Sequence, residues 1–238
     1  MKIKIAHLYY DLLNLYGEQG NIRALQSAFE KQNINTEISL LSVNDKIDFK
    51  KYDIFYMGSG SKENLLIVLE DFKKYTKEFK NAISKNKYFF ATGNSHEIFG
   101  KFIEMNNHKY EGLNVFDYYA KQNPGRIVGE SFMEFENLSP IIGFQNRSCV
   151  IQCDNNHLFS IINGYADNYK SSYEGYRENN FFGTYLIGPL FIRNPHLTDY
   201  IVKDILDKKN SPYTEYLNTY EHKAYKEYLK NFNKEKND

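Results

Sequence analysis

The first half of the chain alternates short apolar runs with segments of helical periodicity, and this alternation is the strongest constraint on its fold. Short apolar runs suited to strands are residues 2–8, 53–57 and 88–92, and Thr36, Ile38 and Leu40 alternate as in a further strand. Helical spacing of apolar side chains is found in residues 21–29, 65–76 and 95–105. Asn21 is placed to cap the first of these helices. Strands that alternate with helices favour a mostly parallel sheet covered by helices on both faces.

After Gly112 the pattern changes to short apolar runs with no long helix between them, which is typical of antiparallel strands or hairpins. These runs are residues 113–119, 126–135, 141–145, 148–152 and 158–162. A last strand is predicted at residues 182–186 and an amphipathic helix at residues 196–207. We therefore predict an α/β domain over residues 1–210, followed by a polar helical tail, rich in Tyr and Lys, over residues 211–238.

The charge balance and the apolar runs exclude several classes of protein. Lys+Arg and Asp+Glu are both 30 in 238 residues, so no net field favours nucleic acid or an anionic membrane. No apolar run approaches the roughly 18 residues that a membrane span needs. We expect a soluble, cytoplasmic protein that does not bind nucleic acid.

The loops after the predicted strands are the places to look for a site, because ligands of such sheets bind at the carboxyl ends of the strands. Gly58, Ser59 and Gly60 lie just before a helix and can present backbone N–H groups to an anion or a developing oxyanion. A turn with two glycines can also be only a turn. The loop lacks the phosphate-binding G-x-x-x-x-G-K-[ST] pattern, and no G-x-G-x-x-G follows the first strand, so nucleotide binding has no support.

Four segments together resemble the class I glutamine amidotransferase family. DLLNLYGEQGN at residues 11–21 is similar to D-x-L-N-L-Y-x-D-x-G-N, and YDIFYMGSGS at 52–61 to D-I-x-x-x-G-G-G. FATGNSHEIFGK at 90–101 is similar to the turn C-G-G-Y-Q-x-x-G-K, and FGTYLIGPL at 182–190 to G-T-Y-L-H-G-P. The resemblance is to the CobB/CobQ-type branch, which includes the glutaminase domains of cobyric acid synthases and the GatD subunits of lipid II isoglutaminyl synthases.

The resemblance implies a flavodoxin-like fold and a known chemistry. In that family a cysteine attacks the side-chain amide of glutamine, a histidine moves the protons, and the released ammonia passes to a partner synthetase. By resemblance the partner here is a Mur-ligase-like subunit that amidates a cell-wall carboxylate, and no cofactor or metal is expected.

Both residues that this chemistry needs are absent from the matching positions. Counting from Gly100 and Lys101 puts Gly93 at the position of the nucleophile, and GTYLIGP puts Ile187 at the position of the histidine. Acyl transfer needs a thiolate and a base that protonates the leaving amine. Neither glycine nor isoleucine can supply them. Glycine also relieves a strained turn that costs other residues about 1–3 kcal/mol.

The rest of the family's pocket is only partly retained. Ser59 replaces the middle glycine of the oxyanion-type loop, to which Asn94 also belongs by resemblance. Arg126 matches an arginine that holds the glutamine carboxylate, although a strand arginine can also serve a surface ion pair. GFQNR at residues 143–147 is similar to the family's G-F-E-N-H but lacks its acid and its histidine.

Other residues near the turn are possible substitutes for the missing groups. Thr92 and Ser95 flank Gly93, and His96 could act as their base, or be a surface or helix-capping histidine. Cys149 and Cys153, with His157 nearby, are read as buried inert thiols. A relocated catalytic pair or a metal site is the alternative, although a metal needs more ligands.

Three functional hypotheses follow. The leading one is a GatD-like subunit that has lost glutaminase activity and keeps a binding, structural or regulatory role. The second is an active glutaminase subunit that uses a non-standard nucleophile. The third is a small-molecule sensor that uses the former glutamine pocket, for glutamine or a related ligand.

Overall fold

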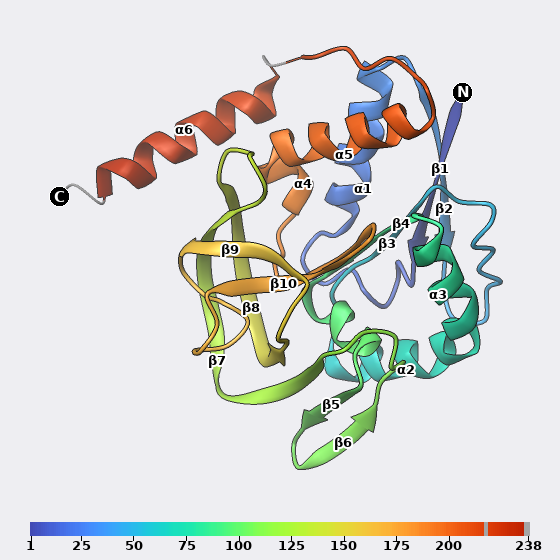
Figure 1. Ribbon diagram of the computed structural model, residues 1–238, viewed down its shortest axis with the longest axis vertical. Coiled ribbons are helices and arrows are strands. Elements are labelled where there is room, and N and C mark those ends of the chain that lie inside the picture. Colours follow the sequence, from blue (N-terminus) through green and yellow to red (C-terminus); the bar gives the residue numbers. More distant parts are fainter. Residues whose placement is uncertain (217–218, 236–238) are drawn as a thin grey trace.

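The computed structural model describes residues 1–216 and 219–235, and eleven strands of these residues form one sheet. Five of the strands are parallel neighbours, in the order β2-β1-β3-β4-β11 (Figure 1). They are β1 (Lys2–Leu8), β2 (Asn35–Leu41), β3 (Ile54–Met57), β4 (Tyr88–Thr92) and β11 (Phe181–Thr184). Strands β3, β4 and β11 are buried along their whole length, as strands covered on both faces are. The predicted parallel core is confirmed.

An antiparallel extension continues this sheet beyond β11. Strand β10 pairs with β11, β9 with β10, and β7 with both β9 and β8, all antiparallel; β5 joins β7 and forms a hairpin with β6. These strands are β5 (Phe102–Met105), β6 (His108–Glu111), β7 (Tyr119–Glu134), β8 (Ile141–Gln152), β9 (His157–Asn163) and β10 (Tyr173–Glu178). The predicted antiparallel additions are confirmed, although β8 is one strand where two were predicted.

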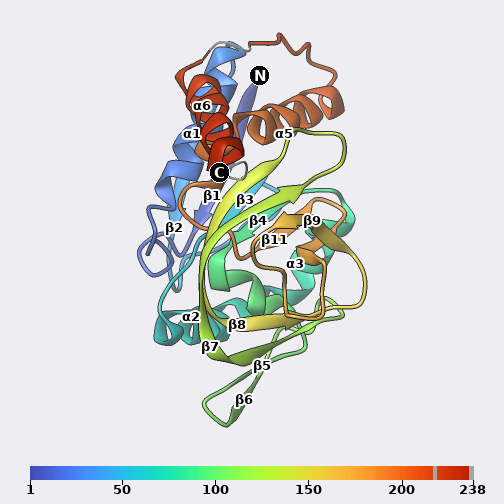
Figure 2. The same cartoon turned by 90° about the vertical axis from the view of Figure 1, so that its left-hand side faces the viewer.

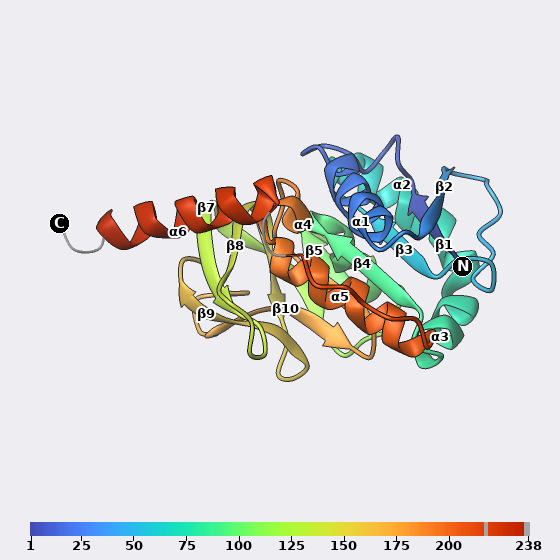
Figure 3. The same cartoon turned by 90° about the horizontal axis from the view of Figure 1, so that it is seen from above.

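Helices cover both faces of the parallel strands and enclose two separate cores (Figure 3). The helices over one face are α1 (Gln19–Lys31), α4 (Leu190–Arg193) and α5 (Pro195–Lys208). The helices over the other face are α2 (Lys62–Phe72), the 3₁₀ helix η1 (Lys73–Tyr75) and α3 (Thr76–Ser84). Side chains of β3 alternate between these cores, with Phe55 and Met57 in one and Ile54 and Tyr56 in the other.

The prediction of a helix over residues 95–105 is wrong. A short 3₁₀ helix, η2 (Gly93–Phe99), follows β4 directly, and β5 begins three residues later. Gly100 has an extended backbone that ends the helix, and Ile103 and Met105 are then buried on alternate positions of a strand. The apolar residues of this segment belong to two short elements, so their spacing imitates one helix.

The prediction that Asn21 caps α1 is also wrong. Glu18 occupies the cap position, and Asn21 lies inside the helix, where it is buried. Its side chain donates a hydrogen bond to the Tyr56 hydroxyl (2.7 Å) and accepts one from the Phe191 amide (2.9 Å). Asn21 therefore joins α1 to β3 and α4.

Beyond α5 the chain runs back over the body and forms α6 (Tyr220–Glu235), which extends past the antiparallel strands (Figures 1 and 2). Tyr225 attaches it by packing against Phe132 and Ile142 and by donating a hydrogen bond to the Pro140 carbonyl (2.5 Å).

Of the predicted tail, residues 217–218 and 236–238 lie outside the described residues, and the boundary at residue 210 stays a prediction. No helix of the described chain is long and apolar enough to cross a membrane.

Candidate functional site

The turn between β4 and η2 has the backbone of a strained elbow. Gly93 has a φ of +65°, in the left-handed region that side chains with a β-carbon rarely adopt. It lies at the carboxyl end of a central parallel strand, where the loops of neighbouring strands converge. The backbone conformation of this turn alone therefore favours glycine.

The space beside Gly93 is also filled. A β-carbon at position 93 would lie less than 3.0 Å from both Cβ and Oγ of Ser59, closer than real β-carbons come, and 3.1 Å from Cγ2 of Ile187. Ile187 is buried after β11 and donates its amide hydrogen bond to the Phe144 carbonyl (2.9 Å). The two positions that the resemblance assigns to the nucleophile and the base are thus neighbours, and no side chain fits at the first.

We expect Gly93→Ala to destabilise the protein through two separate effects. The left-handed backbone costs about 1–2 kcal/mol, and overpacking against Ser59 adds about 1–3 kcal/mol. Chemical denaturation should therefore show a loss of about 2–5 kcal/mol in the free energy of unfolding.

Gly17 is the matched control, because it has a φ of +75° and nothing within 4 Å of its β-carbon position. Gly17→Ala should lose only the backbone part. Adding Ser59→Gly to Gly93→Ala should recover the steric part. Equal losses for the two alanine variants, or no recovery in the double variant, would show that Ser59 does not restrict this space.

The side chain of Asn94 closes the oxyanion-type loop. Its Oδ1 accepts hydrogen bonds from Ser59 Oγ (3.0 Å) and the Gly60 amide (3.1 Å), and its Nδ2 donates to the Gly60 carbonyl (2.9 Å). The predicted association of Asn94 with this loop is present in the structure. The Gly60 N–H, however, already has an acceptor within the protein, so it is not free for an incoming oxyanion.

The Thr92 hydroxyl belongs to a buried hydrogen-bond network with Tyr56 and Glu18. Its hydroxyl donates to Glu18 Oε2 (2.9 Å) and lies 2.6 Å from the Tyr56 hydroxyl, which itself donates to the same carboxylate oxygen. Burial raises the pKa of Glu18, and the Tyr56 and Thr92 hydroxyls oppose that shift. Thr92 serves this network.

Ser95 and His96 do not form a nucleophile and base pair. The Ser95 hydroxyl donates to the carbonyls of Met57 (3.1 Å) and Thr92 (3.0 Å), whereas Nδ1 of His96 bonds to the Gly93 carbonyl (2.6 Å). The expected surface location of His96 is wrong, because the residue is fully buried. Burial lowers its pKa to about 3, so the ring is neutral and packs edge-on against Tyr185.

The two cysteines are unpaired and lack the properties of a nucleophile. Cys149 is buried in β8, where burial and the nearby Glu97 raise the pKa of its thiol far above neutrality. Cys153 is only partly buried, which corrects the expectation of two buried thiols, and its thiol donates to the Asn155 carbonyl (2.7 Å). His157 stacks on Tyr173. The described residues contain no cluster of three or more metal-ligating side chains.

A cavity of about 200 Å³ lies between the elbow, the oxyanion-type loop and the neighbouring edge of β8. Arg126 stands exposed at this cavity, and its Nε donates to Asn146 Oδ1 (2.5 Å). Ser59, Gly60 and Asn94 line the same cavity. The structure therefore brings the predicted Arg126 together with the predicted loop, whereas Thr92, Ser95 and His96 are not part of the lining.

A family model described as the CobB/CobQ-like glutamine amidotransferase domain matches residues 4–195. The chain belongs to this glutamine amidotransferase family. The match covers the elbow, the whole antiparallel extension and the parallel sheet except the first two residues of β1.

Two relatives carry the description lipid II isoglutaminyl synthase (glutamine-hydrolyzing) subunit GatD. The protein from Staphylococcus aureus strain N315 is 29% identical over 213 residues, which cover 89% of this chain and 88% of that protein. The one from Streptococcus pneumoniae strain ATCC BAA-255 / R6 is 29% identical over 213 residues, which cover 87% and 82%. A crystal structure of a glutamine amidotransferase has the same fold, with a TM-score of 0.54, 14% identity and coverage of 85% and 97%.

Glu97 is a pocket residue of this amidotransferase domain that the sequence reasoning missed. Only 2% of it is exposed, and burial raises its pKa to about 7, which the Tyr185 hydroxyl and the Arg147 charge partly oppose. The available signal was the elbow pattern C-G-G-Y-Q, in which the position of Glu97 is a glutamine. The substitution puts an ionisable group where a neutral amide is expected.

Glu97→Gln should raise stability increasingly as the pH rises. The folded protein holds the proton of this carboxyl up to about pH 7, whereas the unfolded chain releases it near 4.5, so Glu97 destabilises the fold across that interval. At about 1.4 kcal/mol per pKa unit, the difference between variant and wild type approaches about 3 kcal/mol at pH 8 and vanishes near pH 4.

Thermal unfolding between pH 4 and pH 8 measures this difference. Glu134→Gln, at an exposed position of β7, is the control and should have the same stability difference from the wild type at every pH. A stability difference for Glu97→Gln that does not grow with pH would contradict the buried, proton-holding carboxyl.

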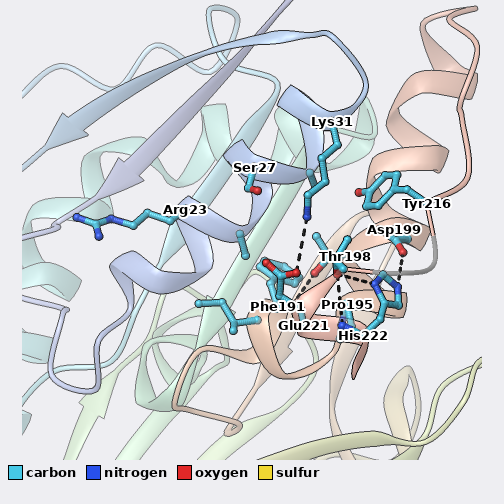
Figure 4. A pocket seen from close by; sticks show the side chains of 14 residues that line it. Arg23, Ser27, Lys31, Phe191, Pro195, Thr198, Asp199, Tyr216, Glu221 and His222 are labelled. Carbon is cyan, nitrogen blue, oxygen red and sulfur yellow. Dashed lines mark hydrogen bonds and ion pairs between the residues drawn. The ribbon is translucent and has the colours of Figure 1, made fainter. Parts of the chain in front are cut away.

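A second cavity, of about 240 Å³, lies between α1, α4, α5 and the start of α6 (Figure 4). Within it His222 bonds to Asp199 Oδ2 (3.0 Å) and to the Thr219 hydroxyl (2.8 Å). The Thr219 hydroxyl also accepts the His222 backbone N–H (3.3 Å), as a residue at a helix N-terminus does. Lys31 of α1 faces Glu221 across the cavity (3.8 Å). These contacts join the tail to the body.

Proposed function

We propose that this chain is a GatD-like subunit without glutaminase activity, which acts in the cytoplasm as a non-catalytic component beside a Mur-ligase-like synthetase in cell-wall amidation. Its role is to bind, organise or regulate that partner. The proposal rests on the family and on the similarity to GatD subunits over most of the length of both chains. The relatives are described as glutamine-hydrolyzing, so the proposal concerns a change of role within a retained fold.

The observation that carries the proposal is the filled space at Gly93. A nucleophilic side chain there would overlap Ser59, whose Cβ is fixed to the backbone and cannot rotate away. Ile187, at the other required position, has no proton to exchange. The Gly60 amide is bonded to Asn94. The absent nucleophile, the absent base and the occupied donor all argue against acyl transfer.

The alternative of a non-standard nucleophile has no support from the neighbouring side chains. The Ser95 hydroxyl donates to backbone carbonyls, which are not bases, and the Thr92 hydroxyl donates to the Glu18 carboxylate within a buried network. Neither residue lines the cavity. The Cys149 thiol stays protonated at neutral pH, because burial raises its pKa.

The proposal predicts that the purified chain releases no glutamate from glutamine, alone or with its synthetase partner. A coupled glutamate dehydrogenase assay should give a rate equal to that without protein. The synthetase should still amidate its substrate when ammonium chloride is supplied, because only the source of ammonia is missing.

A positive control can be built into the same chain. The triple variant Gly93→Cys, Ser59→Gly, Ile187→His restores both chemical groups and the space for the thiol, and it should show glutamate release above the wild-type background. Glutamate release by the wild type that disappears on Thr92→Val, Ser95→Ala or Cys149→Ala would overturn the proposal in favour of the non-standard nucleophile.

A further inference from the structure

We propose that the cavity between the elbow and β8 binds a small dicarboxylate without an amino group, with one carboxylate at Arg126 and the other at Lys62. The inference rests on the proposed function, since a pocket that does not hydrolyse glutamine need not select a ligand with an amide. It gives the pocket a doubly negative ligand in place of glutamine, which has no net charge.

The lining of this cavity has an excess of positive charge. Its cations are Lys62, Arg126 and Arg147, and the only carboxyl among its described lining residues is that of Glu97. No ion pair joins any of these three cations to a carboxylate within the described part of the chain. Charge complementarity therefore favours an anionic ligand, even when Glu97 is ionised.

Arg147 is a fixed charge in the wall of the cavity. Its guanidinium donates to Gln145 Oε1 (2.7 Å) and to three backbone carbonyls, two of them at 2.8 and 3.0 Å. The buried carboxyls of Asp167 and Glu174 attract the same charge, although neither residue lines the cavity. Direct contact with a ligand therefore depends on the other two cations.

Lys62 and Arg126 have donors that a ligand can reach. The terminal nitrogens of Arg126 have no acceptor within the described residues, since only its Nε is bonded, to Asn146 Oδ1 (2.5 Å). A guanidinium with both terminal nitrogens open can hold a carboxylate in the bidentate manner. The Lys62 ammonium lies 5.4 Å from the centroid of the Tyr110 ring and donates to no acceptor in the described chain, so its N–H groups are also open.

The two cations belong to different parts of the cavity wall. Arg126 lies on β7 and is bonded to β8, whereas Lys62 begins α2 and lies over Tyr110 of β6. Two cations held by separate elements suit the two ends of one dicarboxylate better than a single compact anion. Ser61, which caps α2 by accepting the Asn64 amide (3.2 Å), also lines the cavity, so the positive end of that helix adds to the field.

The lining gives no advantage to an amino group, and the volume limits the ligand to a small molecule. Glu97 is the one lining carboxyl that could face an ammonium group, and burial raises its pKa to about 7. A carboxyl that keeps its proton donates a hydrogen bond, which suits a ligand carboxylate. The cavity, at about 200 Å³, is smaller than the roughly 300–1,000 Å³ of pockets for drug-sized ligands.

Isothermal titration calorimetry at pH 6.5 with glutarate, L-glutamate and L-glutamine tests the proposal. These ligands have the same number of carbons and differ in net charge, since glutarate is a dianion, glutamate a monoanion and glutamine neutral. We expect glutarate to bind at least tenfold more tightly than glutamate, and glutamine to bind most weakly. Inorganic sulfate, a compact dianion, should bind at least tenfold more weakly than glutarate.

Variants of the two cations test where the ligand lies. Arg126→Ala and Lys62→Ala should each weaken glutarate binding by tenfold or more, whereas Lys62→Arg keeps the charge and should retain most of the affinity. Lys223→Ala is the matched control and should leave the affinity unchanged. Lys223 is also a lysine in the first turn of a helix and lies over a tyrosine ring (5.6 Å to the Tyr220 centroid), but it does not line the cavity.

The proposal is overturned if glutamate, glutamine or sulfate binds as tightly as glutarate, if the alanine variants at Lys62 and Arg126 bind glutarate as the wild type does, or if no glutarate binds. These outcomes are independent of glutamate release. Glutamate release with an intact preference for glutarate would overturn only the loss of activity. Neither release nor glutarate binding would overturn only this inference.

Discussion

The buried carboxyl of Glu18 holds together the strand ends on which the site is built. It accepts hydrogen bonds from Tyr56 of β3 and from Thr92 at the end of β4, and Asn21 joins the same group to α4. An unpaired carboxyl here would cost at least the 1–3 kcal/mol of a buried polar group without partners. Gly93 follows Thr92 directly, so the network that holds Thr92 also fixes where the elbow begins.

The loop after β3 packs closely against the backbone of the loop after β1, although its residues differ from the family pattern at Ser59. A β-carbon at Gly58 or Gly60 would collide with the Leu13 or Leu12 carbonyl, so both glycines are required by packing. Asn94 then fills the space above the loop with three hydrogen bonds. The elbow and the loop thus stabilise each other directly, with no substrate between them.

The parallel half of the fold could be predicted because its strands are apolar or alternating runs separated by segments of helical spacing, and flanking motifs assigned Gly93 and Ile187 to two positions of the family pattern. The helix over residues 95–105 was wrong because a 3₁₀ turn and a short strand, placed end to end, imitate helical spacing. The burial of His96 was missed because Tyr185, which covers it, is 89 residues away in the sequence. Contacts between distant loops, such as the one between Ser59 and Gly93, have no signature in local periodicity.

The fit between Ser59 and Gly93 also makes two distant positions of the sequence depend on each other. A serine at position 59 and a β-carbon at position 93 exclude each other, so neither position can be varied freely while the other is kept. A cysteine placed at position 93 alone would meet this clash. Any side chain introduced at the elbow therefore needs a smaller residue in the loop after β3 at the same time.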